Sequence, residues 1–169
     1  METRIKRLEN IAFLLIIPLL FTLPLIEGKF RNSISDYVYS DVSLLFSVIL
    51  TFAGTILIVN GCNDDIHLKN KWYAFIQGGL LIGVVLTPHL DYELLHYTFA
   101  GLFFIGSVFE MIFWCSAKYR LTMFFLAFSI LTAMFFHFVT KSYSLFWAEI
   151  IGLTPIIINK LGENNNKLN

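Results

Sequence analysis

The sequence predicts an all-α protein, a polytopic bundle of six transmembrane helices with both termini in the cytoplasm. Three features predict it: an apolar composition, six apolar segments separated by short polar runs, and an uneven distribution of Lys and Arg among those runs. Of the 169 residues, 57% are hydrophobic and only 14% are charged, which is too apolar for a soluble globular domain. Lys+Arg and Asp+Glu number 12 each, so there is no basic excess and no nucleic-acid partner is expected.

The first two apolar segments are residues 11–26 and 42–60, each close to the ~20 residues that a helix needs to cross lipid. The first follows a short basic run, as in a signal peptide, but no small-residue cleavage site follows Leu25, so we expect this helix to be retained. Small hydroxyl residues at every fourth position of the second segment favour close helix packing. We therefore expect this stripe to face inward; it comprises Ser43, Ser47, Thr51 and Thr55.

The remaining four segments are residues 72–88, 93–115, 121–140 and 142–159. Within the third segment, Gly79 and Gly83 form a small-xxx-small pair, which predicts a tight helix contact. The chain ends in a polar, Asn-rich run, LGENNNKLN, which is expected to be disordered. The predicted organisation is a single transmembrane domain over residues 1–160, followed by a disordered polar tail over residues 161–169.

Lys and Arg divide unevenly between the two sides of the predicted bundle. Nine lie on the side of the termini, and three, Lys29, Arg31 and Lys141, lie on the opposite side. Basic residues in short loops gather on the cytoplasmic side of a membrane, so both termini are predicted to be cytoplasmic. We expect a multi-pass protein of the cell membrane, with the polar run 27–41 and the turn 87–93 on the extracytoplasmic side.

Polar and aromatic side chains gather at the predicted outer ends of the segments. His96 and His137 lie within a few residues of those ends, and Glu149 lies about seven residues into the sixth segment. At ~1.5 Å per residue Glu149 lies well inside the lipid, where a charged group costs ~2.5–3.5 kcal/mol and needs a partner. We expect that partner to be His96, His137, a hydroxyl of the second segment or Tyr143. The candidate outward polar pocket comprises Ser33, Ser35, Asp36, Tyr37, His89, His96, His137, Trp147 and Glu149.

The histidines of this pocket raise the question of a cofactor. His89, His96 and His137, with Asp36 or Glu149, have the residue types of a zinc site. However, no two of these histidines have the i, i+4 spacing that places two ligands on one helix face. His96 and His137 also have the residue type of axial haem ligands. No cofactor is assigned, and zinc stays an alternative.

The serines of the pocket raise the question of hydrolysis. Ser33 or Ser35, together with Asp36 and a histidine, supplies the residue types of a nucleophile with a base. The same S-x-S-D pattern also forms capped turns, in which the side chains bond only to nearby backbone. Glu110, near the far end of the fourth segment, is expected at the cytoplasmic interface and outside the pocket.

Several short motifs follow one another along the chain: SISDY before the second segment, TPH at the end of the third, LLHYTFAGLFF opening the fourth and FWAE in the sixth. In this order they resemble bacterial six-helix membrane proteins of the domain-of-unknown-function 998 type, and more distantly the DRAM and Sfk families. The resemblance implies a six-helix membrane protein without an assigned reaction. It singles out Ser33, Ser35, Asp36, Tyr37, Pro88, His96, Trp147 and Glu149.

A looser likeness is to the superfamily of alkaline ceramidases and progestin/adipoQ receptors, in which Ser, Asp and three His build a zinc-dependent lipid amidase. That superfamily has seven spans and an H-x-x-x-H pair, whereas this chain has six apolar segments and no such pair.

Three functions follow as hypotheses. The first is a protein that binds or senses a membrane lipid, or a membrane protein partner or second copy of the chain, through the outward polar pocket. The second is a membrane-embedded lipid hydrolase that depends on a metal or on Ser and His, so the sequence does not decide whether the protein is an enzyme. The third is a small proton-coupled transporter using Glu149, which the lack of a visible internal repeat disfavours.

Overall fold

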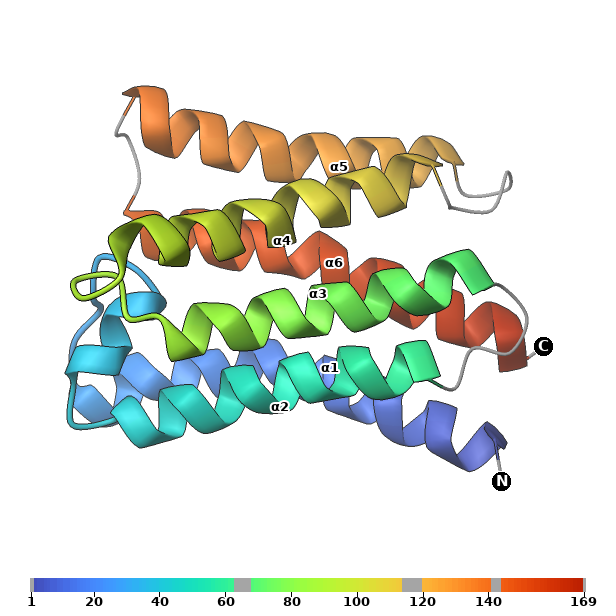
Figure 1. Ribbon diagram of the computed structural model, residues 1–169, viewed down its shortest axis with the longest axis horizontal. Helices are drawn as coiled ribbons and strands as arrows, with labels where there is room; N and C mark the ends of the chain where they lie inside the picture. Colours follow the sequence, from blue (N-terminus) through green and yellow to red (C-terminus); the bar gives the residue numbers. More distant parts are fainter. Residues whose placement is uncertain (1, 63–67, 114–119, 141–143, 169) are drawn as a thin grey trace.

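The computed structural model describes residues 2–62, 68–113, 120–140 and 144–168, and every regular element in these ranges is helical. A short 3₁₀ helix, η1 (Ser35–Tyr39), follows α1, and a π-helical turn, η3 (Phe136–Thr140), ends α5. The six long helices are α1 (Glu2–Glu27), α2 (Ser43–Cys62), α3 (Leu68–Leu86), α4 (Glu93–Phe113), α5 (Arg120–Phe135) and α6 (Leu145–Leu168) (Figure 1). The all-α prediction is confirmed.

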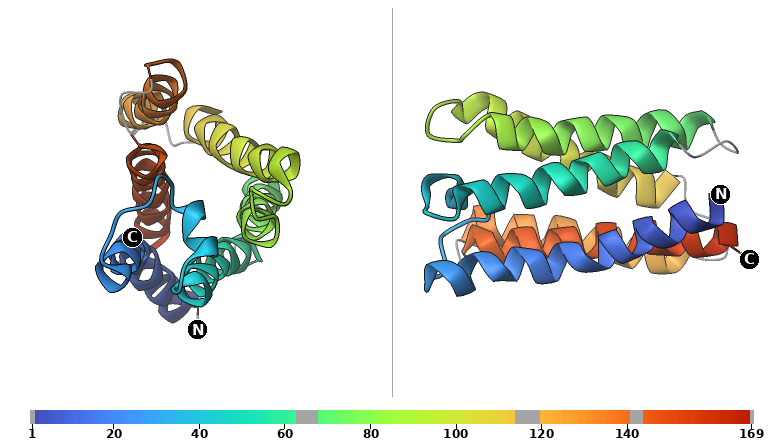
Figure 2. Two further views of the ribbon diagram at one scale, coloured as in Figure 1. Left: turned by 90° about the vertical axis from the view of Figure 1, so that its left-hand side faces the viewer. Right: turned by 90° about the horizontal axis from the view of Figure 1, so that it is seen from below.

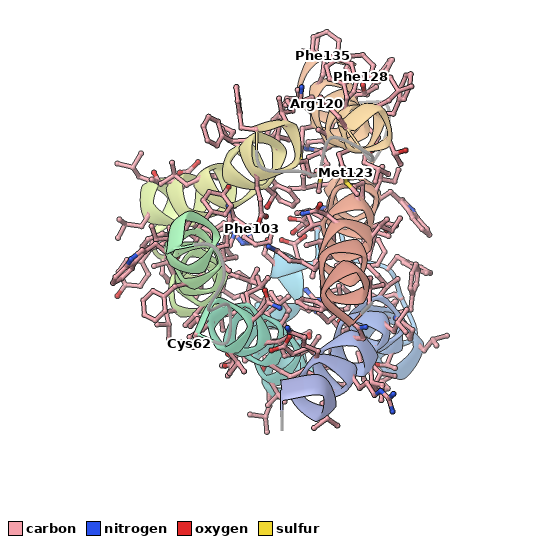
Figure 3. The ribbon with its side chains drawn as sticks, turned by 90° about the vertical axis from the view of Figure 1, so that its right-hand side faces the viewer. Cys62, Phe103, Arg120, Met123, Phe128 and Phe135 are labelled. Atoms are coloured by element: carbon pink, nitrogen blue, oxygen red, sulfur yellow. The ribbon has the colours of Figure 1, made fainter. Side chains whose placement is uncertain are left out.

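The six helices form a ring. Each helix packs against the next one in the chain, and α1 closes the ring by packing against α6. Seen end-on in Figure 2, η1 lies inside this ring at one end. In Figure 3, Phe103 of α4 points into the ring, whereas Phe128 and Phe135 of α5 point away from it. Phe103 is 2% exposed and the two phenylalanines of α5 are more than half exposed, so the ring has an apolar filling and an apolar outer surface.

Among the described residues, five helical stretches are long and apolar enough to cross a membrane: Lys6–Glu27, Ser43–Cys62, Glu93–Phe113, Arg120–Val139 and Leu145–Gly162. The apolar part of α3, Trp72–Leu86, is shorter. Large apolar side chains such as Leu44 and Phe125 stand exposed on the outer surface, as expected where lipid replaces water. These features are consistent with a multi-pass membrane protein.

The two ends of the bundle differ in what they carry. Both termini lie at one end, which we call the inner end (Figure 1). Residues 28–42 and the turn between α3 and α4 lie at the opposite end, which we call the outer end (Figure 1). The polar run and the turn predicted to share one side of the membrane therefore do share one end of the bundle.

The tight contact between α2 and α3 differs from the predicted one. A Cβ atom on Gly54 would lie 2.8 Å from the carbonyl oxygen of Gly78, whereas one on Gly79 would meet nothing within 4 Å. Gly83 lies against the ring of Phe99 instead. The predicted tight contact is therefore wrong at Gly79 and confirmed at Gly83, which packs closely on Phe99 of α4, while Gly78 lies at the interface with α2.

The hydroxyl stripe of α2 is not an inward seam. Thr51 and Thr55 are exposed, and the Thr55 hydroxyl donates to the carbonyl oxygen of Thr51 at 2.8 Å. A hydroxyl bonded to its own helix needs no partner from a neighbour. The prediction is wrong at these positions because the close approach of Gly54 to α3 determines which face of α2 points inward.

The inner end encloses polar side chains within the ring. Glu110 and Lys160 are each 2% exposed and form an ion pair between α4 and α6. The amide of Asn60 donates to the carboxylate of Glu9 at 2.9 Å, which joins α2 to α1. The prediction that Glu110 lies at the interface is wrong. Phe103 and Glu110 are seven residues apart, close to two helical turns, so Glu110 shares the inward face of α4.

The C-terminal segment continues α6 through Leu168, beyond the point at residue 160 where the sequence predicts a disordered tail. Lys160, the last residue of the predicted domain, is buried by its pairing with Glu110. Lys6 is also buried. Two of the nine basic residues counted for the cytoplasmic side are therefore enclosed in the bundle and do not lie on its surface.

We expect Lys160→Met to destabilise the protein by about 3–5 kcal/mol, because it leaves the carboxylate of Glu110 buried without its cation. The double variant Glu110→Leu/Lys160→Met should regain most of that loss, since it removes both charges. Thermal unfolding of the purified protein in detergent measures both effects. Lys29→Met is the matched control, because the Lys29 side chain is 64% exposed. A double variant no more stable than Lys160→Met would contradict the ionic explanation.

Candidate functional site

The candidate site begins with a reciprocal pair of hydrogen bonds at the start of η1. The Ser33 hydroxyl accepts from the backbone N–H of Asp36 at 3.0 Å, and the Asp36 carboxylate accepts from the backbone N–H of Ser33 at 3.2 Å. This is a capping box, which satisfies two backbone donors at once. The Ser35 hydroxyl lies 3.0 Å from that of Ser33. The S-x-S-D pattern therefore forms a capped turn, which was one of the two interpretations of this pattern.

Tyr37 fixes the loop that leads into η1. Its ring is fully buried, and its hydroxyl donates to the carbonyl oxygen of Lys29 at 3.1 Å and accepts from the backbone N–H of Arg31 at 3.3 Å. Burial raises the pKa of the Tyr37 phenol above its ordinary value. The Arg31 guanidinium in turn binds the carboxylate of Glu27, which raises the pKa of Arg31.

Glu149 joins α6 to the same loop. Its Oε2 atom accepts from the backbone N–H of Ile34 at 2.6 Å, and close by the backbone N–H of Phe146 donates to the carbonyl oxygen of Asn32 at 2.6 Å. The partner of Glu149 is thus a backbone group, and neither His96 nor His137 as predicted. Tyr143, another predicted partner, lies outside the described residues. A backbone donor from a loop over a hundred positions earlier leaves no pattern in the sequence.

His89, in the turn between α3 and α4, contacts Asp36, and His96 of α4 lies beside His89. The Nε2 atom of His89 lies 3.2 Å from Oδ1 of Asp36, and the ring centroids of His89 and His96 are 5.6 Å apart. The Nδ1 atom of His96 lies 2.7 Å from the carbonyl oxygen of Thr87, so this nitrogen carries a proton. The Nδ1 atom of His89 is buried, and no hydrogen-bond partner for it lies among the described residues.

These groups line two cavities at the outer end. The first, which we call the mouth, has a volume of about 620 Å³ and is lined by Asn32, Ser33, Ser35, Asp36, His89, Tyr97, His137, Phe138, Ser144 and Leu145. The second, which we call the cleft, has a volume of about 360 Å³. The cleft lies between α4, α5 and α6 and is lined by Ser35, His96, Tyr97, Ala100, Gly101, Phe104, Ile105, Ile130, Leu131, Met134, Phe138, Leu145 and Glu149.

Most of the candidate residues meet at these cavities. The mouth brings together Ser33, Ser35, Asp36, His89 and His137, and the cleft adds His96 and Glu149. Two other candidates do not line either cavity. Tyr37 is buried within the loop. Trp147 is 42% exposed and stacks on Phe30 at a centroid distance of 5.7 Å, on the outside of the bundle.

Sequence reasoning missed Tyr97, Phe138 and Leu145, which line both the mouth and the cleft. Each is an aromatic or aliphatic residue in an apolar segment, so nothing in its local pattern separates it from a lipid-facing residue. The π-helical turn η3, which holds Phe138, also gives no sign in the sequence. π-Helical turns are common at functional sites.

The histidines do not form a metal site within the described part of the chain. No group of three or more His, Cys, Asp or Glu there is arranged to hold a metal ion. Of the three candidate ligands, His89 pairs with Asp36 and His96 bonds to the Thr87 carbonyl. No cofactor is assigned.

The serines are not paired with a histidine. The Ser33 hydroxyl bonds to Ser35 and to the N–H of Asp36, while the imidazole of His89 faces the Asp36 carboxylate. A hydrolase of this type needs a hydrogen bond between the nucleophile and its base, and the described side chains form none between these serines and a histidine.

Fold and site together define a helical protein whose described residues include five candidate membrane spans and two adjoining cavities, the mouth with polar lining groups and the largely apolar cleft. The chain belongs to a family of unknown function, DUF7103, whose model matches residues 16–163. That match shows no link to the domain-of-unknown-function 998 type or to the DRAM and Sfk families. Comparisons with curated proteins and with solved structures gave no match.

We expect Glu149→Leu to release the loop from α6, because the backbone N–H of Ile34 loses its acceptor. Loss of such a bond costs about 1–3 kcal/mol, so amide exchange in peptides covering residues 30–38 should be roughly tenfold faster. Glu149→Gln keeps an acceptor oxygen and should exchange like the wild type. Hydrogen–deuterium exchange in detergent measures this, with α2 peptides as the internal control. Equal exchange in both variants would show that the bond does not hold the loop.

Proposed function

We propose that this protein binds a membrane lipid through the mouth and the cleft. The observation that carries the proposal is that the two cavities adjoin, since Ser35, Tyr97, Phe138 and Leu145 line both of them. A lipid has a polar head joined to an apolar chain. A polar mouth that continues into an apolar cleft fits that shape, since ligand sites combine an apolar lining with a few placed polar groups.

The position of the cleft supports entry from the bilayer. Two of its lining side chains, Ile105 of α4 and Leu131 of α5, are 65% and 47% exposed on the surface of the bundle. In a membrane that surface faces lipid. A lipid chain can therefore pass from the bilayer into the cleft between α4 and α5 while its head group stays near the outer end.

The local hydrogen bonds favour binding over the other hypotheses. Hydrolysis lacks support because the serines bond to each other and to backbone, as described above. A transporter carboxylate would have to change partners during transport, whereas Glu149 holds the backbone of Ile34 in place. A fixed pocket suits a protein that binds a lipid without changing it.

We also propose that the apolar part of α3, Trp72–Leu86, completes a set of six spans, with the inner end in the cytoplasm and the mouth on the extracytoplasmic side. Seventeen of the 19 residues of α3 are not acidic or basic, and a short span is accommodated by local thinning of the bilayer. An even number of spans agrees with the two termini lying at one end (Figure 1).

Cysteine labelling in intact cells tests this orientation. Cys62 is exposed at the inner end of α2, so a membrane-impermeant maleimide should leave it unlabelled until the cells are permeabilised. With Cys62 and Cys115 replaced by serine, Asp41→Cys, an exposed position before α2, should label without permeabilisation. The opposite pattern would place the mouth in the cytoplasm.

Filling the cleft tests the lipid proposal. A Cβ atom on Gly101 meets nothing within 4 Å, so Gly101→Leu should occupy the cleft without disturbing the helices. We expect lipid analysis of the purified wild type to show one lipid class enriched over the bulk membrane, and Gly101→Leu to lose that enrichment.

The control for this experiment is Gly79→Leu on α3, where a Cβ atom also meets nothing within 4 Å. Gly79 is exposed and lines neither the mouth nor the cleft, so this variant should keep the lipid of the wild type. An enrichment that survives Gly101→Leu would contradict binding in the cleft.

A further inference from the structure

The walls of the mouth and the cleft carry carboxylates and no described cation other than imidazole. Asp36 lines the mouth, and Glu149 lines the cleft. Neither Lys nor Arg occurs among the described lining residues. The nearby Arg31 has its guanidinium bound by Glu27, and Lys29 also lies 3.8 Å from that carboxylate. Among the described residues, the lining therefore offers no strong cation to an anionic head group.

The carboxylates retain hydrogen-bonding capacity toward the cavities. Oε2 of Glu149 accepts from Ile34, while Oε1 has no hydrogen bond to the described residues. Each carboxylate oxygen of Asp36 has one partner among the described residues. Oδ2 accepts from the backbone N–H of Ser33, and Oδ1 lies beside Nε2 of His89. A carboxylate oxygen has two lone pairs, so both groups can accept further hydrogen bonds from a ligand.

His96 adds another acceptor beside Glu149. Its Nδ1–H donates to the carbonyl oxygen of Thr87, so in the neutral imidazole the Nε2 atom is an acceptor. His96 is 3% exposed and lines the cleft together with Glu149 and Ser35. The polar end of the cleft thus includes an imidazole acceptor and a carboxyl group, with hydroxyl groups that can act in either role.

We propose that the lipid bound here has a head group that donates hydrogen bonds and carries no phosphate, namely a hydroxyl or amino head group. This inference rests on the proposed lipid-binding function. Hydroxyl and ammonium groups supply the donors that Asp36, Glu149 and His96 can accept, and a charged partner makes such bonds stronger. A phosphate or carboxylate head would bring a further negative charge toward the Asp36 carboxylate in the mouth, which disfavours binding.

A series of probes with the same apolar chain isolates the head group. The four probes are monooleoylglycerol, oleylamine, oleate and oleoyl lysophosphatidic acid. Each competes with radiolabelled monooleoylglycerol for binding to the full chain in phosphatidylcholine nanodiscs. Nanodiscs avoid sugar-based detergents, whose hydroxyl heads would compete for the site. We expect monooleoylglycerol and oleylamine to bind at least about tenfold more tightly than the two anionic probes, a difference of about 1.4 kcal/mol.

Variants that replace a carboxyl group by an amide test whether Asp36 and Glu149 recognise the head group. Glu149→Gln keeps an acceptor for Ile34 and Asp36→Asn keeps one for Ser33, so both preserve acceptors for the loop. Asp36→Asn should reduce the preference for oleylamine over oleate by roughly tenfold, and Glu149→Gln should reduce it less, because Glu149 is enclosed in the cleft. Glu93→Gln is the matched control, because Glu93 is an exposed carboxylate at the same end of the bundle that lines neither cavity. Its preference should equal that of the wild type.

The outcomes separate this inference from the proposed function. If all four probes bind equally and Gly101→Leu abolishes their binding, the lipid site stands and the head-group inference is overturned. Tighter binding of the anionic probes, or an unchanged preference in both variants, also overturns it. If no probe binds, both proposals fail. A preference for donor head groups that Asp36→Asn or Glu149→Gln weakens supports both.

Discussion

The hydrogen bond from the backbone of Ile34 to Glu149 is the contact on which the outer end depends. Residues 28–42 leave the regular helices, and within this run Ser33, Ile34, Ser35 and Tyr37 are buried. Backbone donors in such a place need partners inside the protein. The carboxylate of Glu149 supplies one, the Ser33 and Asp36 pair supplies others, and the hydroxyl of Tyr37 anchors the start of the loop. These bonds place Ser35 and Asp36 at the cavity wall.

The two ends of the ring use buried charges differently. At the inner end, Glu110 and Lys160 satisfy each other and join α4 to α6. At the outer end, Glu149 faces a loop backbone on one side and the cleft on the other. The first arrangement leaves a matched pair inside the bundle, which suits a structural contact. The second leaves the carboxyl group of Glu149 able to form a further hydrogen bond with a ligand in the cleft, which suits a binding site.

The shape and the chemistry of the outer cavity agree with one kind of ligand. Its apolar part lies between α4, α5 and α6, next to apolar side chains exposed on the outer surface of the bundle. Its polar part is made by the loop and by the turn that carries His89. An amphiphile with a chain in the cleft and a donor head group in the mouth satisfies both parts at once. The aromatic residues Tyr97 and Phe138 line the junction between them.

The sequence by itself determined the helical class, the presence of helices apolar enough to cross a membrane and the end of the bundle where the polar residues gather. These follow from composition and from the length of apolar segments, which are local properties of the chain. Successive helices run in opposite directions, so the segments that carry Asp36, His89 and His137 all come to the same end of the bundle. For the same reason, five of the candidate residues were found at the mouth.

Only the tertiary structure decided the contacts of individual side chains. The partner of Glu149 is a backbone N–H of a distant loop, and the partner of Glu110 is a lysine 50 residues later. The rotation of each helix about its own axis decided that Gly78 lies at the helix interface and that Trp147 points away from the cavity. Such rotations depend on packing against several neighbours at once, because in lipid hydrophobicity alone does not tell an inward face from an outward one.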